Sequence, residues 1–471
     1  MHEPLRAADL RAAGRTPAVP FAVVLADGRS VRIERLLRVL PGKRLVGAGA
    51  LEGEPVLVKL FIASASERHW TRELNGIRAL LAAGVPTPAL VEAQALIGGG
   101  HALLTAFVPG AEDLAAVWRD DPEERGPRLL AAAMPLLARM HAAGLRQADL
   151  HLGNFLFAGG TGYVIDGDAV SAVQSPRPLT LAERTDNLAI LFAQLPPHRD
   201  ARRQPFIDAY AAPAAAVVPG ERALQQAVEA VRARRLREFL GKIGRECTQF
   251  AVERGIKRFA VVAREASELL RDFLSRPDIC LDEGVRLKSG GTCTVAEIAA
   301  GGRRLVVKRY NLKHWRHALS RAWRPSRAWH SWREAHRLGF YGIATPRPLA
   351  VLEERFGPLR GRAFLVTEHC AGRSLLDSLD PQQPPSPAVA EALQTLFAEL
   401  RALRITHGDL KASNLLWEDG RVVMIDLDAM CQHRSEGAFV RAWRRDRARF
   451  LRNWPAESVL YRWLDERLPA A

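Results

Sequence analysis

Two aspartates and an asparagine late in the chain have the residue types and spacing of a phosphoryl-transfer site. Asp409 is followed five positions later by Asn414, and Asp426 comes twelve residues after that. Asp409 lies in a polar stretch, whereas Asp426 directly follows the apolar run 422–425, which predicts a buried strand. Phosphoryl transfer needs a carboxylate that accepts the proton of the attacking hydroxyl, with an amide and a second carboxylate that hold Mg²⁺ against the ATP phosphates. We therefore predict Asp409 as the catalytic base and Asn414 and Asp426 as ligands of Mg²⁺.

The same spacing occurs 260 residues earlier in the chain. Asp149, Asn154 and Asp166 repeat the intervals of five and twelve residues, and Asp166 again follows an apolar run, 163–165. Both sets resemble the catalytic loop and metal-binding aspartate of the protein-kinase-like fold. Repetition at a fixed offset indicates duplicated architecture, so we expect two kinase-like units in tandem. Asp149 is the predicted base of the first unit, and Asn154 and Asp166 are its predicted Mg²⁺ ligands.

The elements that must position these residues also occur twice in one order. Strands are predicted over 56–61, 102–108, 304–308 and 363–370, and helices over 67–83, 129–143, 332–338 and 387–403. The first strand of each unit carries a lysine, Lys59 or Lys308, and the helix after it carries a glutamate, Glu73 or Glu334. In a kinase-like site the lysine contacts the α- and β-phosphates of ATP and the glutamate orients it. We predict a Lys59–Glu73 pair and a Lys308–Glu334 pair.

A glycine pair precedes Lys308. Gly290 and Gly291 lie between two predicted strands, where glycines let backbone amides approach phosphates closely. An ordinary hairpin turn has the same pattern, so this interpretation stays open. The stretch 46–49 in the first unit is a weaker candidate, and the sequence has no Walker A motif.

The first unit departs from the second beside its catalytic loop. Gln147 and Ala148 stand where the second unit has His407 and Gly408. In a kinase-like loop this histidine supports the backbone and does not react. Its loss therefore weakens the first site without deleting it.

Length, charge and cysteine usage limit the class of protein. The 471 residues suit two or three domains, and the formal net charge of +15 fits an anionic partner or the arginine-rich composition of a high-GC genome. The five cysteines form no CxxC pair, which favours reduced thiols in the cytosol over disulfides or zinc. Neither a long uncharged apolar run nor a signal-peptide core is present, so we expect no membrane span.

A basic, tryptophan-rich segment over residues 311–333 contains no acidic residue. Indole rings at an interface and arginines for phosphates would suit an anionic membrane or glycolipid. An equally good interpretation is a helix whose tryptophans pack on its own lobe. Stacking of bases on the tryptophans is a third, but no nucleic-acid-binding module is visible, so we expect no nucleic-acid partner.

The predicted fold class is therefore α+β, with two tandem protein-kinase-like bilobal domains. Each has an antiparallel sheet in its N-terminal lobe and helices in its C-terminal lobe. An arginine-rich helix over 220–240 and a β-hairpin over 247–262 separate the two sets of motifs. We place the more divergent domain at 1–240 and the second at 241–471, with a boundary anywhere between about 240 and 280.

Residues 286–454 resemble a known family, the lipopolysaccharide core kinases of Gram-negative bacteria, which are heptose and Kdo kinases of the InaA/WaaP type. The matching features are Gly290-Gly291, Lys308, the basic insert, Glu334, Thr345-Pro346, His407 to Asp409, Asn414 and Asp426. The resemblance implies transfer of phosphate from ATP, with Mg²⁺, to a sugar hydroxyl of the inner core on lipid A. It also implies a cytoplasmic protein, peripheral at the anionic inner face of the inner membrane. The tandem arrangement departs from that family and leaves open whether both sites work.

Two alternatives to this interpretation remain at the level of sequence. One is a protein Ser/Thr kinase, although the short second C-terminal lobe leaves little platform for a peptide. The other is a pseudokinase-type scaffold that binds an anionic membrane through residues 311–333.

Overall fold

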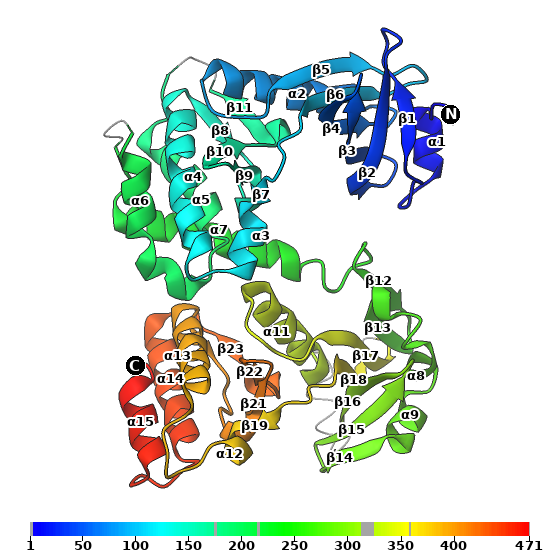
Figure 1. Ribbon diagram of the computed structural model, residues 1–471. Helices are drawn as coiled ribbons and strands as arrows, with labels where there is room; N and C mark the ends of the chain where they lie inside the picture. Colours follow the sequence, from blue (N-terminus) through cyan, green and yellow to red (C-terminus); the bar gives the residue numbers. More distant parts are fainter. Residues whose placement is uncertain (1–2, 174–176, 214–216, 312–324, 358, 471) are drawn as a thin grey trace. The chain divides into compact units, whose positions relative to one another are not determined.

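The computed structural model describes residues 3–173, 177–213, 217–311, 325–357 and 359–470. The chain divides into two compact units. Unit 1 comprises Met1–Leu195 with Arg199–Val231, and unit 2 comprises Pro196–His198 with Arg232–Ala471 (Figure 1). Both units are mixed α+β structures with an antiparallel sheet, which confirms the predicted α+β class. The predicted domain limits at 1–240 and 241–471 stay a prediction.

Unit 1 begins with a six-stranded antiparallel sheet in the order β1-β2-β3-β4-β6-β5. Its strands are β1 (Phe21–Val24), β2 (Ser30–Leu40), β3 (Arg44–Leu51), β4 (Glu54–Phe61), β5 (Leu90–Ala95) and β6 (His101–Ala106). Buried and half-buried residues alternate along β3, as a strand with one face on a core requires. Two helices accompany the sheet, α1 (Ala7–Ala12) and α2 (Glu67–Ala82). The spacing of Leu74, Ile77, Leu80 and Leu81 predicts one apolar face on helix α2, and the helix buries the first three while Leu81 is exposed.

The second part of unit 1 is mainly helical. Its helices are α3 (Leu114–Asp120), α4 (Arg125–Ala142), α5 (Leu181–Phe192), α6 (Gln204–Ala211) and the start of α7 (Glu221–Leu240). Short strands lie among them: β7 (Glu112–Asp113), β8 (Leu145–Gln147), β9 (Phe155–Ala158), β10 (Thr161–Val164) and β11 (Val170–Ala172). Strands β9 and β10 form a hairpin, so the Asp149–Asn154 loop enters it and Asp166 leaves it.

Unit 2 opens with a seven-stranded antiparallel sheet in the order β12-β13-β17-β18-β16-β15-β14. The strands are β12 (Phe250–Arg254), β13 (Arg258–Ala263), β14 (Val285–Ser289), β15 (Cys293–Ala300), β16 (Arg303–Tyr310), β17 (Pro348–Phe356) and β18 (Leu359–Glu368). The helices beside it are α8 (Arg271–Ser275), α9 (Pro277–Glu283) and α11 (Arg327–Tyr341). The hairpin predicted over 247–262 is confirmed, because β12 pairs with β13 and β13 then pairs with β17.

The remainder of unit 2 repeats the helical arrangement of unit 1. Its helices are α12 (Leu375–Ser378), α13 (Pro387–Ala402), α14 (Glu436–Leu451) and α15 (Val459–Arg467). Its strands are β19 (Arg373–Ser374), β20 (Ile405–Thr406), β21 (Leu415–Glu418), β22 (Arg421–Met424) and β23 (Cys431–Gln432). Phe397, Trp443 and Phe450 are fully buried where α13 and α14 pack together. This core fixes the position of the loop that carries Asp409.

Part of the basic segment 311–333 has a packing role. Trp332 is completely buried, and its indole N–H donates to the carbonyl of Ile243, 3.1 Å away. Trp329 is half-buried against Phe259. For these two tryptophans the packing interpretation is the right one. Trp315 and Trp323, on which the membrane interpretation also relied, lie outside the described residues. Among the helices that the structure describes, none is long and apolar enough to cross a membrane.

Candidate active site

The two strand-end aspartates have the same unusual backbone conformation. Asp166 follows β10 with φ of 72°, and Asp426 follows β22 with φ of 60°. Each precedes a 3₁₀ turn, η2 (Gly167–Ala169) or η6 (Leu427–Ala429). The left-handed region is uncommon for a non-glycine residue, and residues held there cluster at functional sites. The shared conformation shows that the two halves are alike at the atoms of the predicted site as well as in spacing.

The loop of Asp409 in unit 2 is tied to the strand that carries Asp426. The Nε2 atom of His407 lies 2.8 Å from the carbonyl oxygen of Ile425. The side-chain amide of Asn414 donates to the carbonyl of Asp409 at 2.9 Å, and the backbone N–H of Ile425 donates to the carbonyl of Asn414. The predicted base and the two predicted metal ligands of this unit therefore belong to one hydrogen-bonded assembly.

Helix α14 holds the same loop from the other side. The backbone N–H of Gly408 donates to Asp446 at 2.9 Å, and the side chain of Asp446 is buried. The residue 260 positions before Asp446 is Asp186 in unit 1, but Asp186 is exposed. The buried neighbour Asn187 takes the role, because its amide donates to the carbonyl of Gln147 at 2.7 Å.

Gln147 makes the same kind of contact in unit 1 as His407 makes in unit 2, which the sequence alone does not suggest. Its side-chain amide donates to the carbonyls of Ile165 and Asp166, at 3.3 and 3.0 Å. Ile165 corresponds to Ile425, so the strand-end backbone is held in both units. The expected weakening of the first site is therefore compensated at this contact.

Asp409 lies between two cations. Lys411 is 3.0 Å from its carboxylate, and Arg449 of α14 contacts the other oxygen. Burial raises the pKa of Asp409, but the hydrogen bonds from Lys411 and Arg449 outweigh it and hold the pKa below its usual value. Asp409 is thus a carboxylate at neutral pH, as a base must be. Its counterpart Asp149 is exposed.

Unit 1 contains the expected contact between Lys59 and Glu73. The two side chains form an ion pair, and that of Glu73 is 0% exposed. The carboxylate of Glu73 also binds the loop after Asp166. The backbone N–H groups of Gly167 and Asp168 donate to it at 3.1 and 3.2 Å. Glu73 therefore joins the lysine strand, helix α2 and the metal-ligand loop.

Unit 2 does not contain the expected Lys308–Glu334 pair. Lys308 contacts Asp426 and Asp428, the latter at 2.8 Å, and Glu334 is paired with Arg337 at 2.7 Å. The physical reason is the register of helix α11.

Both lysine-bearing units have a Thr-Pro pair after the helix, and these pairs fix the correspondence of positions. Glu73 lies fourteen residues before Thr87, and the residue fourteen before Thr345 is Ser331. Glu334 lies three residues further along, nearly one helical turn away, where Arg337 is its neighbour. The predicted Lys308–Glu334 pair is wrong because Glu334 lies at a different helix position from Glu73.

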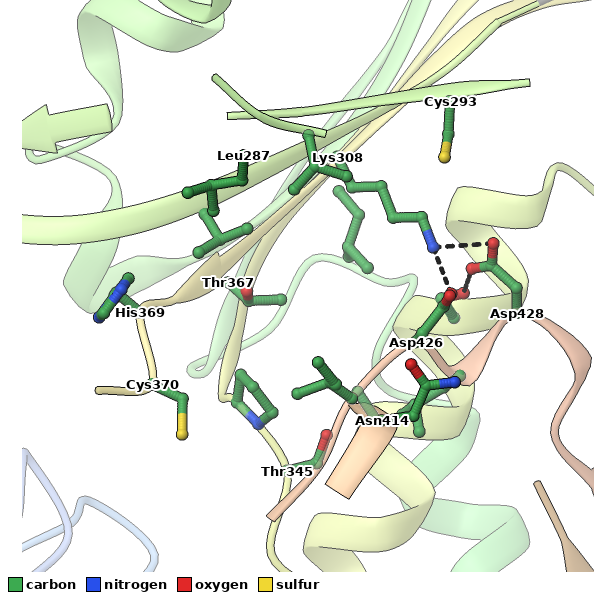
Figure 2. Close-up of a pocket in the computed structure, with 18 of the residues that line it drawn as sticks. Leu287, Cys293, Lys308, Thr345, Thr367, His369, Cys370, Asn414, Asp426 and Asp428 are labelled. Atoms are coloured by element: carbon green, nitrogen blue, oxygen red, sulfur yellow. Dashed lines mark hydrogen bonds and ion pairs between the residues drawn. The ribbon is translucent and has the colours of Figure 1, made fainter. Parts of the chain in front are cut away.

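A cavity of about 360 Å³ opens beside Lys308 (Figure 2). Three of the predicted site residues line it, namely Lys308, Asn414 and Asp426. Its walls include Leu287, Val295, Leu365, Leu416 and Ile425, and the strand end Thr367, Glu368, His369 and Cys370. The ammonium of Lys308 points toward Asp426 and Asp428 at one end of this space (Figure 2). A small apolar cavity with polar groups at one end suits an organic ligand that carries an anionic or metal-bound group.

Other predicted site residues lie outside that lining. Gly290 and Gly291 form the turn between β14 and β15, where the N–H of Gly290 donates to the carbonyl of Cys293. The hairpin-turn interpretation therefore describes their structure, and a phosphate-binding role stays a prediction. Asp409 and Glu334 are also absent from the residues that line the cavity.

The sequence interpretation missed Asp428, although a signal for it exists. Asp426 and Asp428 form an Asp-x-Asp pattern, and Asp166 and Asp168 repeat it in unit 1. Asp428 lines the cavity and contacts Lys308 directly.

The donor set fits Mg²⁺. Carboxylate and amide oxygens are the ligands that this ion prefers. In the part of the chain that the structure describes, the Oδ1 atom of Asp166 is buried without a hydrogen-bond partner, with Lys59 3.7 Å away. No group of three or more His, Cys, Asp or Glu side chains arranged for a metal occurs among the described residues. A metal here would therefore rely on one carboxylate and one amide per unit together with a ligand's own oxygens.

One protein-family model matches segments of both units. The model of the lipopolysaccharide kinase (Kdo/WaaP) family matches residues 57–170 and 282–457, more than half of the chain. Both Asp/Asn/Asp sets and both lysines lie in these segments. Among solved structures, one described as "WaaP in complex with acyl carrier protein" has 20% identity and a TM-score of 0.31, covering 43% of this chain and 86% of the other. No curated protein matches the sequence.

Proposed function

The chain belongs to the lipopolysaccharide kinase (Kdo/WaaP) family, and on that premise we propose that it is an ATP-dependent kinase of the lipopolysaccharide inner core. The acceptor in this proposal is a hydroxyl of heptose or Kdo on lipid A. Each unit is a kinase-like bilobal domain, at 1–240 and 241–471. The protein works in the cytoplasm, at the anionic inner face of the inner membrane. The net charge of +15 supports a polyanionic glycolipid as partner.

The cavity beside Lys308 is the observation that carries this proposal. Its apolar walls suit an adenine ring, and the strand end 367–370 forms part of the lining. Lys308 would hold the phosphates, while Asn414 and Asp426 would hold Mg²⁺. When bound, Mg²⁺ neutralises charge on the phosphates of ATP, which supplies the transferred group.

The chemistry of the chain's own residues then centres on Asp409. Its carboxylate accepts the proton of the sugar hydroxyl, and Arg449 and Lys411 keep it ionised. The tie from His407 and Asn414 to the β22 end fixes the distance between base and metal ligands. Positioning and charge neutralisation supply most of the rate.

Unit 1 carries a second site of the same kind in this proposal. Asp149 is its base, Asn154 and Asp166 hold Mg²⁺, and Lys59 and Glu73 position the phosphates. The intact Lys59–Glu73 pair and the supported loop at Gln147 favour a working site over a degenerate copy.

The test uses purified full-length protein, labelled ATP and core oligosaccharide from a strain that lacks the gene. We expect phosphate on the oligosaccharide, and mass spectrometry of the product identifies the sugar. Asp409→Ala and Asp149→Ala are assayed separately, with thermal unfolding as a control for folding. Full activity in both variants would contradict the mechanism, and label on protein instead of glycolipid would favour a protein kinase.

A further inference from the structure

We propose that Asp428 is the positioning residue of Lys308, in the role that Glu73 has toward Lys59. The inference rests on the proposed function, because it assigns Lys308 to the phosphates of a nucleotide. It concerns a residue that is neither the base nor a metal ligand of the proposed mechanism.

Asp428 receives four donors on its two oxygens. Lys308 at 2.8 Å and Arg327 at 2.6 Å contact Oδ2, while the hydroxyls of Tyr310 at 2.6 Å and Ser331 at 2.7 Å donate to Oδ1. A carboxylate has about four acceptor positions, so these donors satisfy it. The side chain of Asp428 is 11% exposed. It is therefore a fixed structural anion, with no position left for a metal.

The four donors to Asp428 come from a strand and a helix that correspond to the elements joined by Glu73 in unit 1. Lys308 and Tyr310 belong to strand β16, and Arg327 and Ser331 belong to helix α11. In unit 1, Glu73 joins strand β4, helix α2 and turn η2 by accepting from Lys59 and from two backbone N–H groups of the turn. The same three elements are joined in both units, but the carboxylate lies on the helix in unit 1 and on the turn in unit 2.

Two positions differ together between the units, as this exchange requires. The helix position of Glu73 is Ser331, a hydroxyl that donates to Asp428. Two residues after each lysine, unit 1 has Phe61 and unit 2 has Tyr310, whose hydroxyl also donates to Asp428.

The residue that corresponds to Asp428 is Asp168, and it contacts different partners. Arg72 is 2.7 Å from Asp168, and His69 is 3.8 Å away. Lys59 has Glu73 as its partner instead. Asp168 is therefore an internal control for Asp428: the same place in the motif, without the contact to the lysine.

Lys308 needs a second carboxylate partner because its other partner, Asp426, is a proposed metal ligand. Once Asp426 faces a metal, Lys308 keeps a carboxylate partner only through Asp428. Asp428 thus holds Lys308 in place whether or not Asp426 faces a metal.

The experiment measures Lys308 in the protein without nucleotide. Full-length protein is treated with an amine-reactive reagent at one fixed pH, and the time course of modification of Lys308 and of Lys59, called here the modification profile, is followed by mass spectrometry in the same digest. In Asp428→Asn we expect the Lys308 profile to shift to at least about threefold faster modification, because the side chain loses a carboxylate that holds it and opens more often to the reagent. Lys59 should not change. An unshifted Lys308 profile would overturn the proposal.

Matched variants separate this role from a general effect. Asp168→Asn should leave both lysine profiles unchanged, and Glu334→Gln should leave that of Lys308 unchanged. A Lys308 shift in Glu334→Gln as large as that in Asp428→Asn would overturn the assignment.

A double variant tests whether a glutamate on the helix can replace Asp428. Asp428→Asn combined with Ser331→Glu restores a helix glutamate, as in unit 1, so the Lys308 profile should return toward that of the wild type. This double variant also replaces the single one if Asp428→Asn fails to fold. A folded double variant with Lys308 still shifted would contradict the proposal.

Kinase assays then relate Asp428 to the reaction. Asp428→Asn should raise KM for ATP by about tenfold or more, whereas Asp168→Asn should not affect the unit 2 site. One outcome is that the wild-type protein phosphorylates no core sugar while Asp428→Asn still changes the modification of Lys308 as expected. In that case the proposed function is wrong, and the role of Asp428 as positioning residue is supported.

Discussion

Gln147 in unit 1 and His407 in unit 2 contact the same backbone position with different chemistry. Gln147 reaches the carbonyl of Ile165 at 3.3 Å, and His407 reaches that of Ile425 at 2.8 Å. Both side chains are 0% exposed. A buried carbonyl without a donor costs stability, so this contact supports the strand end that precedes Asp166 or Asp426.

The first prediction follows from that contact. Gln147→Ala should lower the free energy of unfolding of unit 1 by about 1–3 kcal/mol, because it leaves buried carbonyls unpaired. Gln147→His should lose less, since imidazole performs this role in unit 2. Hydrogen exchange at residues 164–168 in the three proteins would measure the effect, and equal protection in all of them would contradict it.

The second prediction concerns Asp409 as the base. Asp409→Asn keeps the size of the side chain but cannot accept the proton. In an Asp149→Asn background, where the proposed base of unit 1 is removed, it should lower kcat on core oligosaccharide by about 10²–10⁴-fold. The melting temperature should stay near that of Asp149→Asn alone, because the side chain of Asp409 is only partly buried. Activity of the double variant within a few-fold of that of Asp149→Asn alone would rule out this role.

A third prediction tests the metal ligands through stability instead of turnover. A non-hydrolysable ATP analogue with Mg²⁺ should raise the melting temperature of the wild type, since a ligand at 100 times its Kd stabilises by about 2.7 kcal/mol. The Mg²⁺-dependent part of the shift should shrink in Asp426→Asn and in Asp166→Asn, and vanish when both are changed. A shift unaffected by EDTA would contradict the assignment.

The fourth prediction uses His336, which is packed among Phe239, Phe250 and Trp332. In the described part of the chain its Nε2 atom is buried without a hydrogen-bond partner, and burial lowers its pKa to about 4 from the model-compound value of 6.5. The unfolded chain therefore binds a proton that the folded one does not. Stability contributed by the neutral ring is lost as pH falls from about 6.5 to about 4, by up to about 3 kcal/mol.

His336→Phe removes this titrating group and the unpaired nitrogen while it keeps an aromatic ring. The melting temperature of the variant should exceed that of the wild type at pH 5, and the difference should shrink at pH 8. His141, whose pKa burial also lowers to about 4, remains in unit 1 of both proteins and supplies the shared background. Parallel melting temperatures of the two proteins across this pH range would contradict the prediction.

The local elements of this protein were predictable because local physics produces them. The apolar spacing along 67–83 predicted the face of α2 that buries Leu74, Ile77 and Leu80, although Leu81 from the same predicted face is exposed. The apolar run before Asp426 predicted strand β22. The side-chain periodicity of a helix or strand extends over a few residues, so the spacing of apolar residues near one another in the sequence predicts it. The equal intervals of five and twelve residues likewise predicted two similar sets of residues, and the two strand-end aspartates share one backbone conformation.

The partners of Lys308 could not be predicted from the sequence, because they depend on how elements far apart in the chain pack together. Asp426 and Asp428 lie 118 and 120 residues away from it. Which carboxylate reaches the ammonium depends on the register of α11 against turn η6, and a shift of three positions separates Ser331 from Glu334. By itself the sequence determined two kinase-like sets of residues and the order of their elements. Only the tertiary structure decided that one lysine is held from the helix by Glu73 and the other from the turn by Asp428, since side-chain pairing follows packing geometry instead of spacing along the chain.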